Sequence, residues 1–225
     1  MSGDMDVAAV GALLAEPARA RVLLALADGR SLAASVLAAE AGVAPSTASH
    51  HLARLVEGRL LNVVTRGRHR YFTLAGPHVA ELIEAVARVA PPEPVTSLRQ
   101  GTRAHAIRYA RRCYDHLAGR LGVAVTEALQ DDGVLVAAGG AGYTVTPKGA
   151  STLAALGIEM QPGTFARACL DWSEQRHHVA GALGRALMTR LTELGWVRRE
   201  TATRALSVTE AGRANLPRRL GVTLP

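Results

Sequence analysis

The stretch LAAEAGVAPSTASHHLARL (37–55) decides the fold of the N-terminal part of this chain. Gly42 is typical of the end of one helix, where the backbone turns tightly. Pro45 suits the first position of a second helix, because its missing N–H is not needed there. Leu52 and Leu55 then fall on one face of that helix and predict its buried stripe. The stretch therefore predicts a helix-turn-helix, whose second helix enters the DNA major groove with its N-terminal end.

A β-hairpin is predicted directly after the helix-turn-helix. Leu60, Leu61, Val63 and Val64 form the first strand, the segment Arg66-Gly67-Arg68-His69-Arg70 forms a polar tip, and Tyr71-Phe72-Thr73-Leu74 forms the returning strand. Three arginines around one glycine cannot be packed in a core, so this tip faces solvent or phosphate. Following a helix-turn-helix, we interpret it as a wing that contacts the DNA backbone or minor groove.

These motifs, over residues 8–90, resemble the ArsR family of bacterial winged-helix regulators. The resemblance implies a homodimer whose first and last helices pair, and operator DNA that is released when an effector binds. By position in the motif it also implies which side chains contact DNA. Hydroxyl and imidazole groups at the helix start would read the bases, and arginines would hold phosphates. The DNA-binding residues predicted in this way are Ser46, Thr47, Ser49, His50, Arg54, Arg66, Arg68 and Arg70.

The metal sites familiar from this family are not intact here. The helix before the turn, at 31–42, contains no cysteine. The last helix of the domain has His78, Glu81 and Glu84, with Arg88 where a second histidine would be expected. We therefore interpret His78 as a surface residue or a helix cap.

The composition indicates a globular protein. Of 225 residues, 48% are hydrophobic and 20% charged, which excludes disorder as the dominant state. Two cysteines cannot build a disulfide framework. No apolar run approaches 18 residues, and the chain starts with acidic Asp4 and Asp6 where a signal peptide is basic. We expect a soluble cytoplasmic protein that does not contact membranes.

The rest of the chain contains an internal repeat. After an extended linker at 91–98, rich in proline, HLAGRLG (116–122) recurs as HVAGALG (178–184), and TVTPKG (144–149) recurs as SVTEAG (207–212). Each copy predicts a long helix, a hairpin and the start of a short helix, which is the second half of a winged helix.

The predicted fold class is therefore mainly α with small β-hairpins (α+β). A winged helix-turn-helix domain (1–90) precedes a C-terminal sensor or dimerisation domain (99–225). That domain is made of two winged-helix-like halves, at about 103–158 and 165–220, related by a pseudo-two-fold axis. Trp172 and Trp196 are expected to pack in its core.

Both cysteines lie in the repeated element, close to histidines. Cys113 and His116 are three residues apart and would share one face of a helix, whereas Cys169 and the histidines eight and nine positions later would converge loosely. Three interpretations stay open: core packing, a redox-sensing thiol pair or organic-ligand pocket, and a site for zinc or another thiophilic metal or metalloid such as arsenite. The candidate ligands are Cys113, His116, Cys169, His177 and His178.

The C-terminal part also holds most of the positive charge. Residues 1–90 contain 9 arginines and 8 acidic residues, a net charge of +1, while residues 91–225 contain 17 basic and 11 acidic residues, a net charge of +6. Several arginines cluster near position 110. Three interpretations of them stay open: a phosphate-binding stripe, a pocket for an acidic ligand, or a solvated helix face. They are Arg103, Arg108, Arg111, Arg112 and Arg120.

Three classes of function compete. The first is a sequence-specific transcriptional regulator, in our reading a dimeric repressor of double-stranded operator DNA whose C-terminal domain binds a small effector. The second is an architectural DNA-binding protein without an effector, suggested by the basic excess. The third is an enzyme, but the sequence has no nucleophile elbow, phosphate-binding glycine loop or HExxH motif, so we expect no enzymatic activity.

Overall fold

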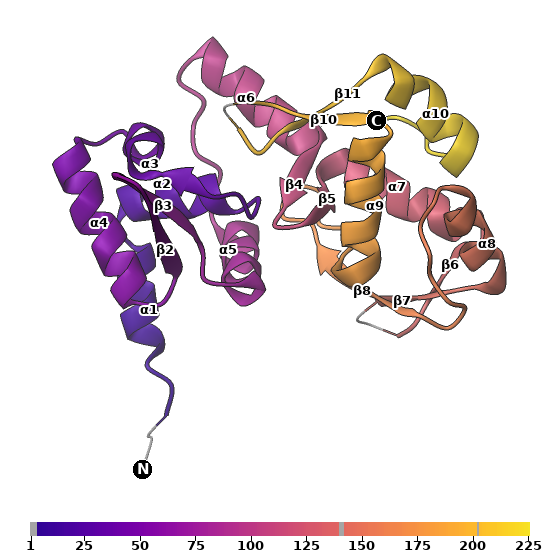
Figure 1. Ribbon diagram of the computed structural model, residues 1–225, viewed down its shortest axis with the longest axis horizontal. Coiled ribbons are helices and arrows are strands. Elements are labelled where there is room, and N and C mark those ends of the chain that lie inside the picture. The colour runs from indigo at the N-terminus through magenta and orange to yellow at the C-terminus, as the bar shows by residue number, and fades with distance from the viewer. Residues whose placement is uncertain (1–3, 140–141, 202) are drawn as a thin grey trace. The chain divides into compact units, whose positions relative to one another are not determined.

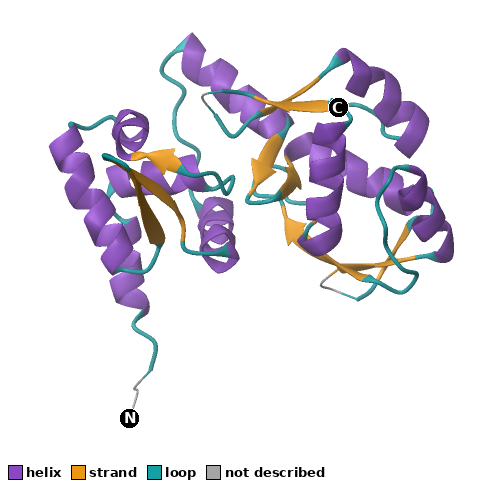
Figure 2. Ribbon diagram, viewed as in Figure 1, coloured by secondary structure: helices purple, strands orange, loops and turns teal. Residues whose placement is uncertain are grey.

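The computed structural model describes residues 4–139, 142–201 and 203–225. Contacts within the chain divide it into two units, Met1–Ile83 and Glu84–Pro225. Both consist of helices with small antiparallel sheets (Figures 1 and 2), which confirms the predicted fold class. Within the described residues, no helix is long and apolar enough to cross a membrane. The predicted limits of the domains, at residues 90 and 99, stay a prediction.

The first unit is a winged helix-turn-helix. Its small sheet has the strand order β1-β3-β2, and β2 and β3 form the predicted hairpin. Its elements are α1 (Val7–Leu14), α2 (Pro17–Leu26), β1 (Leu32–Ala33), α3 (Ala34–Ala41), α4 (Pro45–Glu57), β2 (Leu61–Arg66), β3 (His69–Leu74) and the first part of α5 (Pro77–Val89).

The helix-turn-helix forms for the reasons visible in the sequence. Gly42 ends α3 in the left-handed conformation, with φ of +70°, which a residue with a side chain adopts only with strain. Pro45 is the first residue of α4. Leu52 and Leu55 are fully buried, and they point into a core shared with α2 and α3. This packing fixes the start of α4 at the surface of the unit.

The second unit contains the rest of α5 and the remaining elements. They are α6 (Leu98–Tyr109), β4 (Arg111–Cys113), β5 (His116–Ala118), α7 (Gly119–Asp131), β6 (Leu135–Ala137), β7 (Gly142–Val145), α8 (Pro147–Ala155), β8 (Phe165–Leu170), β9 (His177–Val179), α9 (Gly181–Glu193), β10 (Val197–Arg199), β11 (Leu206–Val208) and α10 (Glu210–Leu220). The segment 91–96 between α5 and α6 forms no helix or strand.

The repeat predicted from the sequence is present in the structure. The series α7, β6, β7, α8 matches the series α9, β10, β11, α10. Equivalent threonines cap the last helix of each copy: the hydroxyl of Thr146 accepts from the N–H of Gly149, and that of Thr209 accepts from the N–H of Gly212. Each hydroxyl also donates to a carbonyl just before the hairpin.

The two copies are interlocked through their hairpins. The hairpin β8–β9, which begins the second copy, pairs with β7 of the first copy in a sheet of order β6-β7-β8-β9. The hairpin β4–β5, which begins the first copy, is joined to β11 of the second by a bridge between Arg111 and Ala205. Each half therefore contacts the other through its first hairpin, by strand pairing in the case of β8–β9 and by a single bridge in the case of β4–β5.

The structure corrects the predicted surroundings of the cysteines. Cys113 and His116 do not share a helix face: they end β4 and begin β5, and they pair across a two-residue turn. Cys169 pairs in the same way with His178 across the β8–β9 hairpin. The physical reason is Gly119, whose φ of +77° turns the chain between β5 and α7, so the helix cannot extend back to the histidine.

The arginines near position 110 do not form one helical stripe. Arg108 is exposed on α6, whereas Arg111 on β4 is fully buried, so the solvated-face reading is wrong for Arg111. Trp196 lies in the core as predicted, while Trp172 is only half-buried and lies against Arg111.

Candidate functional site

The start of α4 presents the predicted DNA-reading side chains. Ser46, Thr47 and His50 are exposed there. Ser49 is half-buried, and its hydroxyl donates to the carbonyl of Pro45 at 2.9 Å, so its donor is already used within the helix. Exposed hydroxyl and imidazole groups at the N-terminal end of such a helix can reach base edges in the major groove. Their contacts with DNA stay a prediction.

The predicted phosphate-binding arginines are also exposed. Arg54 lies further along α4, and Arg66, Arg68 and Arg70 lie at the tip of the β2–β3 hairpin. The guanidinium of Arg70 is 6.0 Å from the centre of the Phe72 ring, which steadies that side chain along the wing. The guanidinium groups of this tip are placed to bind phosphate oxygens.

Four of the five candidate metal ligands converge in the second unit. The ligand atoms of Cys113, His116, Cys169 and His178 all lie within 4.8 Å of one another. Three of the four side chains are buried and that of Cys169 is half-buried. The fifth, His177, is exposed and does not join them, because neighbouring residues of a strand point to opposite faces. We call the four converging residues the Cys/His cluster.

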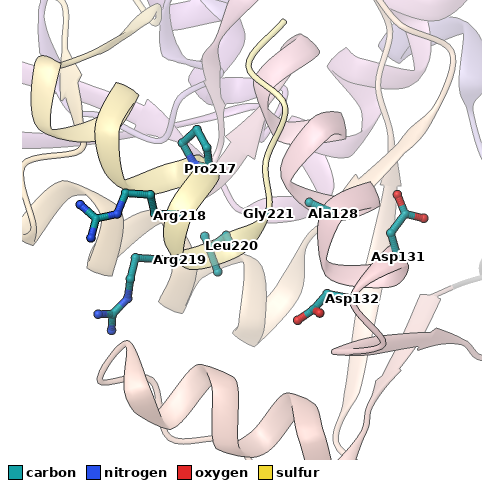
Figure 3. A pocket seen from close by; sticks show the side chains of 8 residues that line it. All are labelled: Ala128, Asp131, Asp132, Pro217, Arg218, Arg219, Leu220 and Gly221. Carbon is teal, nitrogen blue, oxygen red and sulfur yellow. The ribbon is translucent and has the colours of Figure 1, made fainter.

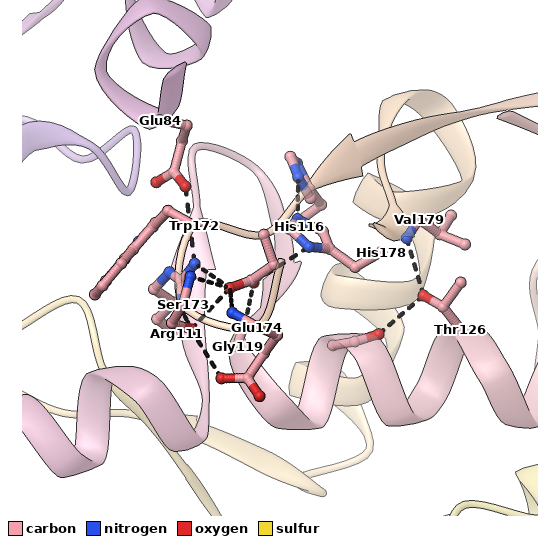
Figure 4. Close-up of polar contacts among 12 residues, drawn as sticks. Glu84, Arg111, His116, Gly119, Thr126, Trp172, Ser173, Glu174, His178 and Val179 are labelled. Atoms are coloured by element: carbon pink, nitrogen blue, oxygen red, sulfur yellow. Dashed lines mark hydrogen bonds and ion pairs between the residues drawn. The ribbon is translucent and has the colours of Figure 1, made fainter. Parts of the chain in front are cut away.

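The two imidazoles of the cluster face each other (Figure 4). The Nε2 atoms of His116 and His178 are 3.1 Å apart. On the opposite side of each ring, Nδ1 meets a carboxylate: Nδ1 of His116 lies 3.0 Å from Asp115, and Nδ1 of His178 lies 3.3 Å from Asp171. Asp115 is in turn held by Arg185, at 2.8 Å. Both rings are thus oriented so that Nε2 points into the cluster.

The electrostatics of the cluster favour a thiolate at Cys169. A hydrogen bond with Cys113 lowers the pKa of Cys169 far below its ordinary value, and His116 and His178 lower it further, although burial acts in the opposite direction. The hydrogen bond with Cys169, with burial, raises the pKa of Cys113. Burial would lower the pKa of His178, but Asp171 and Cys169 raise it to about 8. The cluster therefore concentrates a thiolate sulfur and imidazole nitrogens away from water.

A buried ion-pair network supports the cluster from one side (Figure 4). Asp171 accepts from the guanidinium of Arg111 at 2.8 Å and from the backbone N–H of Gly119 at 2.7 Å. Arg111 also lies 3.7 Å from Glu84 and 4.6 Å from the centre of the Trp172 ring. Burial would raise the pKa of Asp171, but His178 and Arg111 hold it well below its ordinary value. Asp171 thus stays ionised beside His178.

Two glycines leave room for the two histidines. A Cβ atom on Gly184 of α9 would lie 3.0 Å from the Cβ of His116, and one on Gly122 of α7 would lie 3.7 Å from the Cβ of His178. The arrangement is reciprocal: the helix of each copy packs against the histidine of the other. The second glycine of HLAGRLG and of HVAGALG is therefore explained by the close approach of its helix to a histidine of the other copy.

The sequence reasoning missed Asp115, Asp171 and the buried role of Arg111. A signal for them was present, because Arg-x-Cys-x-Asp occurs twice, at 111–115 and 167–171. The spacing between cysteine and histidine differs, since two residues separate them in the first copy and eight in the second. A search at one fixed offset aligns the histidines and leaves the cysteines and carboxylates out of register.

A separate surface pocket of about 430 Å³ lies at the other end of α7 (Figure 3). Its polar rim has two carboxylates on one side and two guanidinium groups on the other. It is lined by Ala128, Asp131, Asp132, Pro217, Arg218, Arg219, Leu220 and Gly221. No member of the Cys/His cluster lines it, and we assign it no function.

Comparisons with known proteins identify the family. A helix-turn-helix domain family matches residues 14–64. The chain is 41% identical over 224 residues to an uncharacterised HTH-type transcriptional regulator, YdfF, of Bacillus subtilis, covering 97% of this chain and 99% of the relative. It is 35% identical over 100 residues to the HTH-type transcriptional regulator CmtR of Mycobacterium tuberculosis, covering 43% of this chain and 84% of CmtR.

A similar solved structure is the homodimeric winged helix-turn-helix domain of a possible ArsR-family regulator from Mycobacterium bovis. It is 34% identical and covers 40% of this chain and 89% of that chain, with a TM-score of 0.35. The YdfF relative, in contrast, spans both units of this chain. The chain therefore belongs to the HTH-type transcriptional regulators, and it carries a winged helix-turn-helix domain at its N-terminus and an extra C-terminal region.

Proposed function

We propose that this regulator is a dimeric repressor that binds operator DNA in the cytoplasm and changes its affinity for DNA when its second unit binds an effector. The observation that carries the effector is the Cys/His cluster, because four possible ligand groups converge among the described residues of the second unit. Helices α7 and α9 begin with Gly-Arg-Leu and Gly-Ala-Leu, which offer no hydroxyl groups for base readout. The second unit is therefore suited to sensing and not to reading sequence.

The N-terminal helix supports a dimer. α1 consists only of valine, alanine, glycine and leucine, yet it has no buried residue, and Val7 is 76% exposed. On α5, Val89 is 84% exposed. Apolar helix faces of this kind are normally covered by a partner, and the resemblance to the ArsR family implies pairing of these two helices. Sedimentation of the full chain should give twice the monomer mass of 23.6 kDa.

Operator binding can be tested with the promoter of the protein's own gene. Fluorescence anisotropy with a labelled duplex should show binding to this promoter roughly 10³-fold or more tighter than to random DNA. Thr47→Val removes an exposed hydroxyl without changing the shape of the side chain. Because two half-sites each lose one hydrogen bond, we expect operator affinity to fall roughly tenfold, with random DNA unaffected. Equal operator affinity of wild type and variant would remove Thr47 from the reading surface.

The wing is tested by salt dependence. Arg68→Ala should lower the slope of log affinity against log salt by about one unit per lost phosphate contact, and hence by about two units for a dimer. Arg213→Ala is the matched control, because it removes the same charge from the exposed face of α10. An equal change of slope in both variants would show that net charge, and not the wing, determines DNA binding.

A second candidate function is architectural DNA binding without an effector, which the net charge of +6 on residues 91–225 favours. The two functions differ in specificity. An architectural protein should bind the promoter and random DNA with similar affinity, and metal ions or thiol reagents should leave this affinity unchanged. The same anisotropy series therefore separates them.

A further inference from the structure

We propose that the Cys/His cluster binds one Zn²⁺ ion in tetrahedral geometry, through Cys113, His116, Cys169 and His178. The binding itself is argued from the geometry below, whereas the role of the ion as the effector rests on the function proposed above. Cys₂His₂ is one of the ligand sets that Zn²⁺ takes in proteins. Here two ligands come from the β4–β5 hairpin and two from β8–β9.

The two histidines require a positive charge between them. Each Nδ1 lies next to a carboxylate, which favours a proton on that nitrogen and leaves Nε2 of each ring facing the cluster. Two neutral rings in this state would direct two lone pairs at each other across 3.1 Å, so one positive charge, either a proton or a metal ion, is needed between the two Nε2 atoms. A metal ion that accepts both lone pairs supplies this charge.

The distances within the cluster suit a single small ion. With Zn–N bonds of about 2.0 Å, two nitrogen ligands of a tetrahedron are roughly 3.3 Å apart, and with Zn–S bonds of about 2.3 Å, two sulfurs are roughly 3.8 Å apart. The observed Nε2–Nε2 distance is 3.1 Å, and all the ligand atoms lie within 4.8 Å of one another. Zn²⁺ can therefore be accommodated by small movements of the side chains.

The surroundings match those of protein zinc sites. A metal-bound histidine commonly donates its other ring N–H to a carboxylate, which fixes the ring and raises its basicity. Asp115 and Asp171 occupy these positions for His116 and His178. Core packing does not explain these contacts, because apolar side chains of similar volume would fill the space without burying two carboxylates and two imidazoles.

The ion would connect the two halves of the second unit. Each half supplies one Cys–His pair. In both hairpins the cysteine lies directly opposite the histidine on the neighbouring strand, although the second hairpin has six more residues between the two. Four protein ligands leave no open coordination position, which is typical of structural and regulatory sites and not of catalytic ones. Binding of the ion would therefore stabilise the interlocked arrangement, since no half holds a complete site.

The test uses the full-length protein, purified under reducing conditions and stripped of metal with a chelator. Native mass spectrometry after addition of Zn²⁺ should show one ion per chain. Addition of Co²⁺ should give the visible absorption of tetrahedral cobalt and a thiolate-to-cobalt charge-transfer band, which reports on sulfur ligation directly. Cys113→Ser/Cys169→Ser should lose the charge-transfer band and bind Zn²⁺ more than about 100-fold more weakly, because even an outer-shell partner is typically worth 10–100-fold.

His177→Gln is the matched control, because His177 is next to His178 in the chain but exposed. It should bind Zn²⁺ and Co²⁺ like the wild type. The proposal is overturned if the reduced wild-type protein, shown to be folded by circular dichroism, takes up no Zn²⁺ or gives no charge-transfer band with Co²⁺. It is also overturned if the double serine variant binds Zn²⁺ as tightly as the wild type.

The two proposals fail in different ways. If one Zn²⁺ binds as described but operator affinity is the same with and without it, the metal site stands and the effector role fails. If no metal binds but operator affinity responds to oxidants or to an organic ligand, the zinc site fails and regulation through the second unit stands.

Discussion

The Nε2 atoms of His116 and His178 lie 3.1 Å apart, although 62 residues separate these histidines in the chain. His116 is the first residue of β5, and His178 is the second residue of β9. The hairpin β8–β9 joins the sheet of the first copy, and β4–β5 is bridged to the second copy at Ala205. The site is therefore formed by the interlocking of the two copies and not by either copy alone.

The carboxylate of Asp115 should determine how strongly the cluster binds zinc. It is a positioning residue: it lies 3.0 Å from Nδ1 of His116 and points the opposite ring nitrogen into the cluster. Asp115→Ala should weaken Zn²⁺ binding by roughly 10- to 100-fold, and Asp115→Asn, which keeps an acceptor oxygen, should weaken it less. Competition with a chromophoric zinc chelator measures both affinities.

Asp132→Asn is the control for Asp115, because it neutralises an exposed carboxylate paired with Lys148 at the far end of α7. It should leave the zinc affinity unchanged. If all three variants weaken binding equally, the effect arises from net charge, and the orientation of His116 by Asp115 is not required.

The helix-turn-helix and the wing could be predicted from the sequence because their signals are local. Gly42, Pro45 and the leucines of α4 each specify a backbone feature within a few residues. The three arginines of the wing surround one glycine in a hairpin whose register follows from the alternation of side chains. Such patterns need no knowledge of the rest of the fold.

The repeat was also recognisable, but the geometry of the cluster was not. The helix predicted for Cys113 and His116 is wrong because Gly119 turns the chain before α7, and its positive φ depends on where α7 packs. Each cysteine pairs with a histidine of its own hairpin, but the two hairpins, which are over fifty residues apart in the chain, are brought together only by the tertiary fold. The buried position of Arg111 likewise depends on Asp171, sixty residues later.

Arg111 should be essential for the stability of the second unit, and Arg108 should not. Both guanidinium groups lie over the Trp172 ring, at 4.6 Å and 5.4 Å, but Arg111 is fully buried and Arg108 is exposed. Arg111→Ala leaves the buried carboxylate of Asp171 without its guanidinium partner, so we expect the free energy of unfolding to fall by about 3–5 kcal/mol. Arg108→Ala should cost less than about 1 kcal/mol.

Urea unfolding followed by tryptophan fluorescence measures both arginine variants, because the two tryptophans of the chain, Trp172 and Trp196, lie in the second unit. Similar losses of stability in Arg111→Ala and Arg108→Ala would show that contact with the Trp172 ring, and not the buried ion pair, is the stabilising interaction.

Gly184 should be intolerant of even a single added methyl group. A Cβ atom there would lie 2.6 Å from the carbonyl oxygen of Val179 and 3.0 Å from the Cβ of His116, and neither position can move without displacing a strand. Gly184→Ala should therefore destabilise the second unit by about 1–3 kcal/mol and weaken Zn²⁺ binding by displacing His116.

The control is Gly101→Ala in α6, where the added atom meets only Val95 at 3.4 Å. Alanine favours a helix over glycine by up to about 1 kcal/mol, so this control should be neutral or slightly stabilising in the same urea titration, with zinc affinity unchanged. Because both substitutions are from glycine to alanine within a helix, a loss confined to Gly184→Ala isolates the close approach of α9 to His116 as its cause.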